Sequence, residues 1–277
     1  MIKRYFSVAA VSDVGGGKST NQDNLLVKIG EDKYGDFGLF IVADGMGGLS
    51  YGAIASRIVV NKFGIWWETK FKEILKNYKS DVIKIVNKEL NYTVEEANNE
   101  VINFSKVVGE RVGTTISVLF LYKDSYIIKH IGDSRVYAVS DDLLQLTIDH
   151  SWVAREIRYG RLTEKEAKRH PRRNVLTQCI GVSKKIDIYE DYGLINKNEV
   201  YFICSDGFYR LIKGNEIQEL LRDYSEKKII TLKDVASNLL ENVKKRNPKD
   251  NISIIIISPE EHSFRKNSIG KVKAAMF

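Results

Sequence analysis

Cysteine is the scarcest residue in this chain, with only two among 277 residues. Two thiols are too few for a disulfide framework, and their spacing matches no cysteine-based zinc site. Cys204 also lies inside an apolar run, where a small buried side chain is expected. We therefore expect Cys179 and Cys204 to be reduced thiols.

Long hydrophobic runs are also missing. No apolar stretch approaches the roughly 18 residues that a membrane-spanning helix needs. Residues 1–5 lead directly into a strand-like pattern and lack the apolar segment of a secretory signal. Hydrophobic residues still make up 43% of the chain, which is enough for a sizeable core and excludes disorder over most of its length. We expect a folded cytoplasmic protein without membrane contact.

Nucleic-acid-binding motifs are absent too, although the chain is basic. There is no zinc finger, no aromatic RNA-binding motif and no helix-turn-helix pattern. The formal net charge is +7, and residues 155–173 contain eight Lys or Arg and three Glu. One explanation of this charge is a lysine-rich surface in contact with solvent. The other is an anionic partner, which could be an acidic or phosphorylated protein or a nucleic acid. Without a supporting motif, we expect no nucleic-acid partner.

What the sequence does contain is a set of aspartates at the ends of apolar strands. The first is Asp44, which follows the apolar run 39–43 and precedes Gly45, Gly47 and Gly48. Such a run bounded by glycine indicates a buried strand, so Asp44 would lie at its end and face a cleft. A hairpin turn is the alternative for Asp-Gly, but residues from 50 onward have a helical pattern.

Three further aspartates occupy similar positions. Asp206 ends the apolar strand 201–205, Asp133 follows a strand that ends near 132, and Asp250 precedes the apolar strand 252–257. One such aspartate is more often part of a turn than a ligand. Four of them from distant parts of one chain favour a shared oxygen-rich site, which suits Mg²⁺ or Mn²⁺.

A glycine-rich loop, residues 14–23, contains Gly17-Lys18-Ser19. A phosphate-binding P-loop would need glycine at position 12, which is Ser12, and a helix after the loop. Residues 24–28 instead have a strand pattern. We therefore prefer a glycine loop that presents Lys18 to an anion.

The order of predicted elements is strands, two helices, an antiparallel meander over 113–146, strands, helices and a last strand. Strands are predicted at 3–13, 24–28, 39–43, 113–122, 126–132, 136–139, 143–146, 186–192, 200–205 and 252–258. Helices are predicted from 50 to about 66, and at 83–108, 151–159, 163–169, 214–223 and 232–245. This order differs from the alternation of a parallel α/β fold and indicates an α+β sandwich in one domain.

Eight short motifs in this order resemble the metal-dependent protein phosphatases of the protein phosphatase 2C family, above all its compact bacterial members. The motifs lie at Asp23, 44–48, 113–115, 132–135, 149–151, 170–177, 205–207 and 250–251. The resemblance covers about residues 5–258 and implies a four-layer α-β-β-α sandwich. It also implies one catalytic domain over 1–258, with a mobile flap at 149–177. Residues 259–277 form a polar tail that we expect to be mobile.

The resemblance implies two Mn²⁺ or Mg²⁺ ions between the two sheets. Asp44 would bridge both ions with help from the Gly45 carbonyl. Asp206 and Asp250 would complete the shell of the first ion. The ions would neutralise the phosphate and lower the pKa of the water between them, and the resulting metal-bridging hydroxide would attack phosphorus directly.

The resemblance also assigns roles outside this pair of ions. Asp133 would share a third, looser ion with Asp206, assisted by Asn174. Asp23 would belong to the outer shell. Lys18 would bind the phosphate in place of the arginine that the family usually has there, without the planar fork of a guanidinium.

The implied function is a serine/threonine protein phosphatase that acts on phosphorylated proteins, opposes a cognate kinase and works as a monomer. Two departures from the family pattern motivate an alternative. Lys18 replaces an arginine, and Gln22 stands where an acid is common. The alternative is a catalytically weak phosphatase-like module that binds phosphoproteins or signals by conformation.

Overall fold

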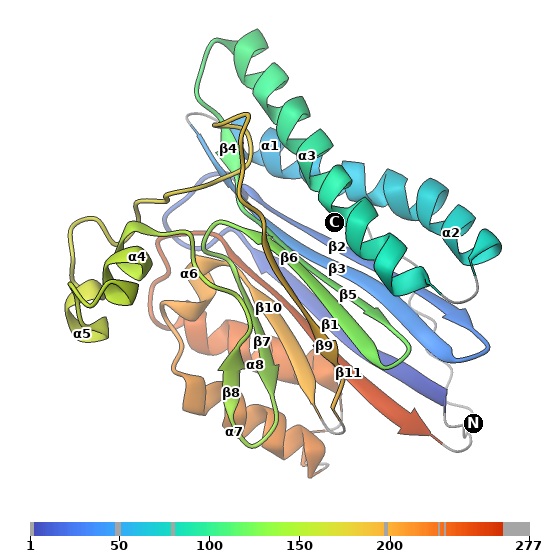
Figure 1. Ribbon diagram of the computed structural model, residues 1–277. Coiled ribbons are helices and arrows are strands. Elements are labelled where there is room, and N and C mark those ends of the chain that lie inside the picture. Colours follow the sequence, from blue (N-terminus) through green and yellow to red (C-terminus); the bar gives the residue numbers. More distant parts are fainter. Residues whose placement is uncertain are drawn as a thin grey trace.

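The computed structural model describes residues 3–47, 51–78, 81–196, 199–226, 228–229 and 231–262, with the backbone alone at 261–262 (Figure 1). The described strands fall into two groups. The first sheet contains β2 (Asp23–Asp32), β3 (Gly35–Met46), β5 (Ile116–Tyr122), β6 (Ser125–Ile131) and β9 (Tyr189–Leu194), with the short β4 (Gly113–Thr114) on the end of β3. The second contains β1 (Lys3–Asp13), β11 (Ile252–His262), β10 (Val200–Cys204), β7 (Arg135–Val139) and β8 (Leu143–Gln145). A parallel bridge between Arg4 and Gly35 joins them.

Helices cover the outer face of each sheet. Helices α1 (Tyr51–Trp66) and α3 (Val82–Val108) pack on the first sheet, and α7 (Gly214–Ser225) and α8 (Leu232–Lys244) pack on the second (Figure 1). A third hydrophobic cluster lies between the two sheets. Three apolar interfaces require four layers, which confirms the predicted α-β-β-α sandwich.

Strand β3 shows how one sequence serves two of these interfaces. Leu39 and Ile41 belong to the cluster beneath the helices, whereas Phe40 and Val42 belong to the cluster between the sheets. Successive side chains of a strand point to opposite faces, so a strand buried on both faces has an unbroken apolar sequence. This is why residues 39–43 carry no polar side chain.

The predicted meander over 113–146 is confirmed in its first and last antiparallel pairs, β5–β6 and β7–β8, but wrong in its middle, where β6 and β7 do not pair. Strand β6 pairs with β5 and β9, whereas β7 pairs with β10 and β8 in the other sheet. The chain crosses between the sheets at residues 132–134. Gly132 has φ +116°, and a Cβ there would lie 2.5 Å from the Thr115 side chain. The pattern of the strands predicted their existence, but this crossing depends on a backbone conformation suited to glycine.

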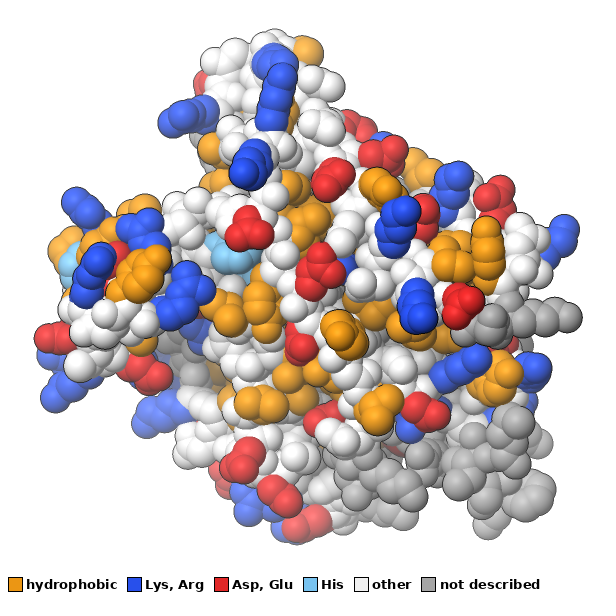
Figure 2. Space-filling model, in the orientation of Figure 1, with side chains coloured by type: hydrophobic (Ala, Val, Ile, Leu, Met, Phe, Trp, Pro, Cys, Tyr) orange, Lys and Arg blue, Asp and Glu red, His pale blue; other side chains and the backbone are white. Residues whose placement is uncertain are grey.

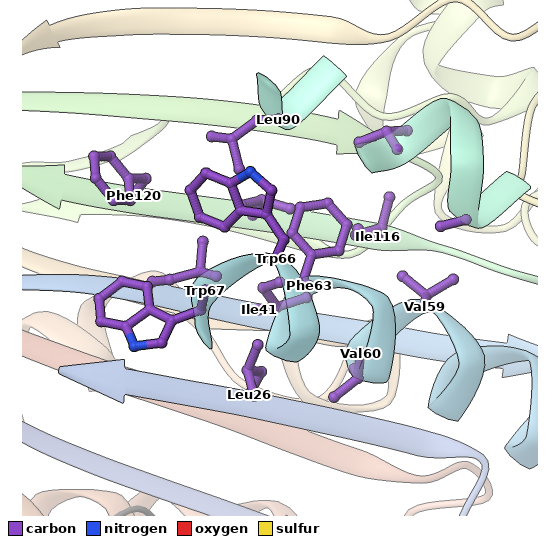
Figure 3. Close-up of a cluster of buried hydrophobic side chains, with 14 of the residues drawn as sticks. Leu26, Ile41, Val59, Val60, Phe63, Trp66, Trp67, Leu90, Ile116 and Phe120 are labelled. Carbon is purple, nitrogen blue, oxygen red and sulfur yellow. The ribbon is translucent and has the colours of Figure 1, made fainter. Parts of the chain in front are cut away.

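The first long helix is interrupted where two tryptophans follow each other. Helix α1 is continued by a π-helical turn, η1 (Trp67–Phe71), and by α2 (Lys72–Asn77), while Ser50 lies outside the described residues. Trp66 and Trp67 are 4% and 6% exposed and lie in the core beneath α3 (Figure 3). Trp66 stacks on Phe71, so both tryptophans serve packing. The extra residue of a π-turn changes the direction of the following side chains.

Other expectations concern the termini and the thiols. Strand β11 continues to His262 by pairing with β1, so it is longer than predicted, and 263–277 lie outside the described residues. Cys179 and Cys204 are buried and free, as expected. Among the described helices, none combines the length and apolar character needed to cross a membrane.

Candidate active site

Hydrogen bonds of its backbone hold Asp44 near the end of the interior strand β3. Its carbonyl accepts hydrogen bonds from the Thr115 amide at 2.8 Å and the Thr114 hydroxyl at 2.9 Å, and its amide donates to Thr115 Oγ1 at 3.0 Å. Strand β3 continues through Met46, so Asp44 lies before the strand end and not at it as predicted. With its backbone groups satisfied, only the Asp44 side chain remains available as a ligand.

Five aspartates form what we call the aspartate cluster. The members are Asp23, Asp44, Asp133, Asp206 and Asp250. Burial raises the pKa of Asp44 well above its usual range, and repulsion from each of the other four carboxylates raises it further. Burial is also the main reason that the pKa of Asp23 and that of Asp133 are raised to about 7. The predicted carboxylates therefore lie close enough to interact, with like charges that a cation would stabilise.

Asp23 faces Asp44 across the β2–β3 ladder. Its Oδ2 accepts a hydrogen bond from Ser205 Oγ at 2.9 Å, and Ser205 Oγ in turn accepts one from the Ser253 amide at 3.0 Å. Its Oδ1 is buried and has no hydrogen-bond partner. An unsatisfied buried carboxylate oxygen is costly, and a hydrated cation would satisfy it. This orphaned acceptor and the all-oxygen donor set fit Mg²⁺ or Mn²⁺.

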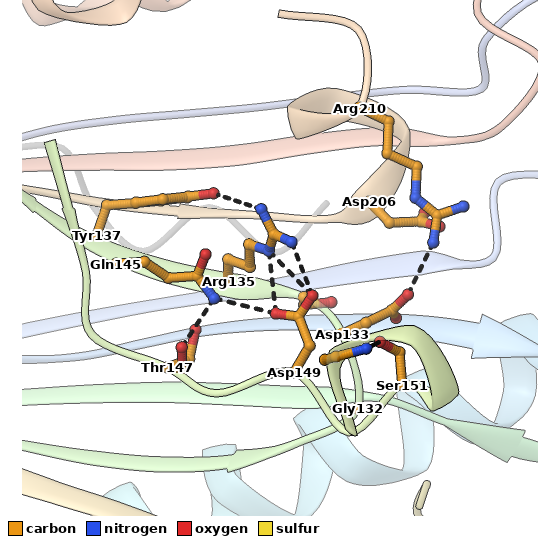
Figure 4. A network of polar contacts seen from close by, with 12 residues as sticks. Gly132, Asp133, Arg135, Tyr137, Gln145, Thr147, Asp149, Ser151, Asp206 and Arg210 are labelled. Atoms are coloured by element: carbon orange, nitrogen blue, oxygen red, sulfur yellow. Dashed lines mark hydrogen bonds and ion pairs between the residues drawn. The ribbon is translucent and has the colours of Figure 1, made fainter. Parts of the chain in front are cut away.

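Two basic side chains pair with the aspartate cluster. Lys18 Nζ lies 3.2 Å from Asp250 Oδ1. Arg210 Nη2 lies 3.0 Å from Asp133 Oδ2 and 3.1 Å from Asp206 Oδ2 (Figure 4). With the carboxylates directed at these cations, no three His, Cys, Asp or Glu side chains of the described residues converge as ligands on one point. Three of these carboxylates could hold one ion together only if their side chains turned.

The glycine loop lies directly against the strand-end segment that carries Asp250. The Gly16 amide donates to the Pro248 carbonyl at 2.9 Å, and a Cβ at Gly17 would lie 2.4 Å from the Lys249 carbonyl oxygen. This close contact places Lys18 at the cluster, as its predicted role requires. The loop leads into strand β2 and not into a helix, so it lacks the architecture of a P-loop.

Two other glycines permit close backbone contacts beneath the cluster. A Cβ at Gly45 would lie 2.1 Å from the Gly52 carbonyl oxygen. A Cβ at Gly207 would lie 2.1 Å from the Asn251 carbonyl oxygen. Asp206 is the first residue of the short helix α6 (Asp206–Tyr209), so the second contact brings it beside the segment that carries Asp250.

The predicted flap, 149–177, forms a projecting loop with two short helices, α4 (Trp152–Arg158) and α5 (Glu164–Ala167) (Figure 1). Lys and Arg side chains gather on its surface (Figure 2). Thr163 and Glu166 form a capping box at the start of α5. At the base of the loop, Arg135 Nε and Nη2 donate to the Asp149 carboxylate, and Arg135 lies 3.8 Å from the centre of the Tyr209 ring (Figure 4).

Arg210 is the member of the site that the sequence analysis missed. It follows Asp206 by four residues in a helical segment, a spacing at which an acid and a base meet on one helix face. That spacing was visible in the sequence. Its second contact, to Asp133, was not, because it depends on how the two sheets stack.

Comparisons with known proteins agree with this geometry. The family model described as protein phosphatase 2C matches residues 16–253. Protein phosphatase PhpP of Streptococcus pneumoniae is 30% identical over 261 residues, covering 92% of this chain and 98% of the relative. The S. agalactiae serine/threonine phosphatase superposes with a TM-score of 0.79 at 28% identity, covering 92% of this chain and 100% of that one.

A third similarity concerns the fold alone. The catalytic domain of the serine/threonine protein phosphatase PstP, solved with two manganese ions, has a TM-score of 0.74 at 22% identity. It covers 93% of this chain and 99% of that domain. The family model spans most of the chain, and the chain covers nearly all of its streptococcal relative. The chain therefore belongs to the protein phosphatase 2C family of metal-dependent serine/threonine protein phosphatases.

Proposed function

We propose that the aspartate cluster binds two divalent ions, Mn²⁺ or Mg²⁺. Asp44 would lie between them with the Gly45 carbonyl beside it, and Asp206 and Asp250 would complete the ligand set. Asp23 would act through the water shell of the ions. The observation that carries this proposal is the buried Oδ1 of Asp23, which lacks a hydrogen-bond partner directly opposite Asp44, and repulsion of Asp44 by four carboxylates supports it. The two manganese ions in PstP are consistent with it.

When bound, such ions neutralise a phosphate ester and lower the pKa of water held between them. The residues of this chain hold that arrangement in place. The backbone contacts of Asp44 orient its carboxylate, and Lys18 becomes available for the phosphate once an ion takes Asp250 from it. Neither thiol competes as a nucleophile, because burial raises the pKa of Cys179 to about 11 and raises that of Cys204 still further.

The proposed substrates are phosphoserine and phosphothreonine side chains of proteins in the cytoplasm, placed there by a cognate kinase. We propose that the enzyme acts as a monomer. The basic surface of the flap supports an acidic or phosphorylated protein as the partner, because clustered positive charge attracts such a chain before it binds.

The test is hydrolysis of an aryl phosphate and a phosphothreonine peptide with Mn²⁺, with Mg²⁺ and with a chelator, for the wild type and for Asp206→Ala. We expect activity that depends on metal and disappears in the variant. Activity in excess chelator would contradict the proposal. Two calorimetrically detected ions without hydrolysis of any phosphopeptide would instead support the alternative of a weak phosphatase-like binding module.

Lys18→Arg should tighten phosphate binding. Arginine offers a planar pair of donors to phosphate where lysine offers a point charge, so we expect the KM for a phosphothreonine peptide to fall roughly fivefold, about 1 kcal/mol. Steady-state kinetics at saturating Mn²⁺ would measure the change, with Lys18→Ala expected to raise KM. A lower kcat/KM in Lys18→Arg than in the wild type would contradict the idea that lysine binds the phosphate more weakly than arginine would.

A further inference from the structure

Arg210 makes three contacts that join separate parts of the site. Its Nη2 is 3.0 Å from Asp133 and 3.1 Å from Asp206, and its Nη1 donates a hydrogen bond to Asn174 Oδ1. Asp133 lies in the crossing between the sheets, Asp206 begins α6, and Asn174 belongs to the flap. One guanidinium thus bridges two carboxylates of the aspartate cluster (Figure 4) and the flap.

The guanidinium is well suited to this position. It is permanently charged and presents its donors in a rigid plane, so Nη2 can contact the two carboxylates while Nη1 donates to Asn174. The side chain of Arg210 is 29% exposed, and those of Asp133 and Asp206 are 7% and 14% exposed. The ion pair is therefore shielded from water and less screened by salt than a surface pair.

We propose that Arg210 is an internal cation that competes with a third metal ion for Asp133 and Asp206, and that it restrains the flap through Asn174. The inference rests on the proposed two-ion site and adds that Arg210 opposes the binding of a third ion. Two ions would bind without displacing Arg210 from Asp133, because the guanidinium contacts Oδ2 of Asp206 and leaves Oδ1 for the first ion. A third ion must displace the guanidinium, and this displacement also releases Asn174. Occupancy by a third ion is thereby coupled to the mobility of the flap.

The size of the effect follows from competition. Suppose that the two carboxylates are free of Arg210 in only about a tenth of the molecules. Removing Arg210 then lowers the apparent Kd of the third ion about tenfold. Loss of the Asn174 contact alone leaves the guanidinium between the carboxylates. The two parts of the proposal can therefore be separated by substituting the two residues one at a time.

The experiment is a Mn²⁺ titration of the full chain, in which electron paramagnetic resonance counts free and bound ions. The variants are Arg210→Ala, Asn174→Ala and, as a matched control, the exposed Arg222→Ala. We expect two tight ions in every protein and a third ion bound about tenfold more tightly in Arg210→Ala alone. Hydrogen–deuterium exchange of residues 172–177 should accelerate in both Arg210→Ala and Asn174→Ala but not in the control.

Three results would overturn the inference. An unchanged third-ion affinity in Arg210→Ala, with two tight ions still bound, would remove it and leave the proposed function intact. Unchanged hydrogen–deuterium exchange in the flap of both variants would show that Arg210 does not restrain the flap through Asn174. Absence of any tight Mn²⁺ in the wild type would overturn the inference together with the two-ion site. If Arg210→Ala does not fold, Arg210→Gln keeps the side-chain length without the charge and serves in the same titration.

Discussion

Asp44→Asn is expected to reduce kcat for a phosphothreonine peptide by about 10³-fold or more at saturating Mn²⁺, because it removes the charge proposed to lie between the two ions. The substitution keeps the shape of the side chain and changes no backbone contact of this strand. Steady-state assays over a wide range of Mn²⁺ concentrations would distinguish a loss of catalysis from a loss of metal affinity.

The same variant should have the opposite effect on the stability of the metal-free protein. Removing a desolvated carboxylate that four others repel lowers the cost of folding the cluster, so the urea midpoint in chelator should rise. Asp142→Asn, in an exposed turn, is the matched control and should change neither measurement. A variant that keeps more than about a tenth of the activity would contradict the bridging role. A lower urea midpoint of Asp44→Asn would contradict the claim that repulsion among the carboxylates destabilises the metal-free protein.

Gly45→Ala is expected to distort the site without removing any ligand. The new Cβ would lie 2.1 Å from the Gly52 carbonyl oxygen and 2.7 Å from that of Gln22, and neither backbone atom can move alone. The end of β3 must shift, and a displacement of about 1 Å in an active site can cost about 10²-fold in rate. We expect a loss of that order in kcat/KM together with a lower melting temperature.

Gly64→Ala provides the control for the same chemical change. Gly64 lies inside helix α1, and a Cβ there meets nothing within 4 Å. Alanine is the better helix former by about 1 kcal/mol, so this variant should be as active as the wild type and somewhat more stable. Equal activity of the two alanine variants would mean that the β3 end tolerates movement. Circular dichroism melts and peptide kinetics on both proteins would decide the matter.

The sequence predicted the helices, the strands and the aspartates of the site better than it predicted which strands pair and which side chains contact these aspartates. An apolar run followed by aspartate and glycine is a local signal, so Asp44 and Asp206 could be recognised without a structure. The pairing of β7 with β10 could not, because strands 126–131 and 135–139 are close in sequence and each matches a hairpin pattern. The crossing depends on Gly132, whose left-handed backbone leaves no trace in the periodicity of its neighbours.

The chemical environment of the acids was also beyond the sequence. The unpaired Oδ1 of Asp23 is a property of how β2, α6 and β11 pack around it. The double contact of Arg210 depends on the distance between Asp133 and Asp206, which belong to different parts of the fold. Residue types and spacing predict which groups can bind a cation, whereas competing ion pairs appear only once the layers are stacked.

The two sheets supply the cluster from opposite sides, and this has a mechanical consequence. Asp23 and Asp44 belong to the first sheet, whereas Asp206 and Asp250 adjoin strands β10 and β11 of the second. Apolar contacts between sheets are not directional, so they resist separation more than sliding. Ions held by carboxylates from both sheets would cross-link the two sheets. Bound metal would then fix how the two sheets align with each other. A chelator would let the sheets shift relative to each other before either sheet unfolded.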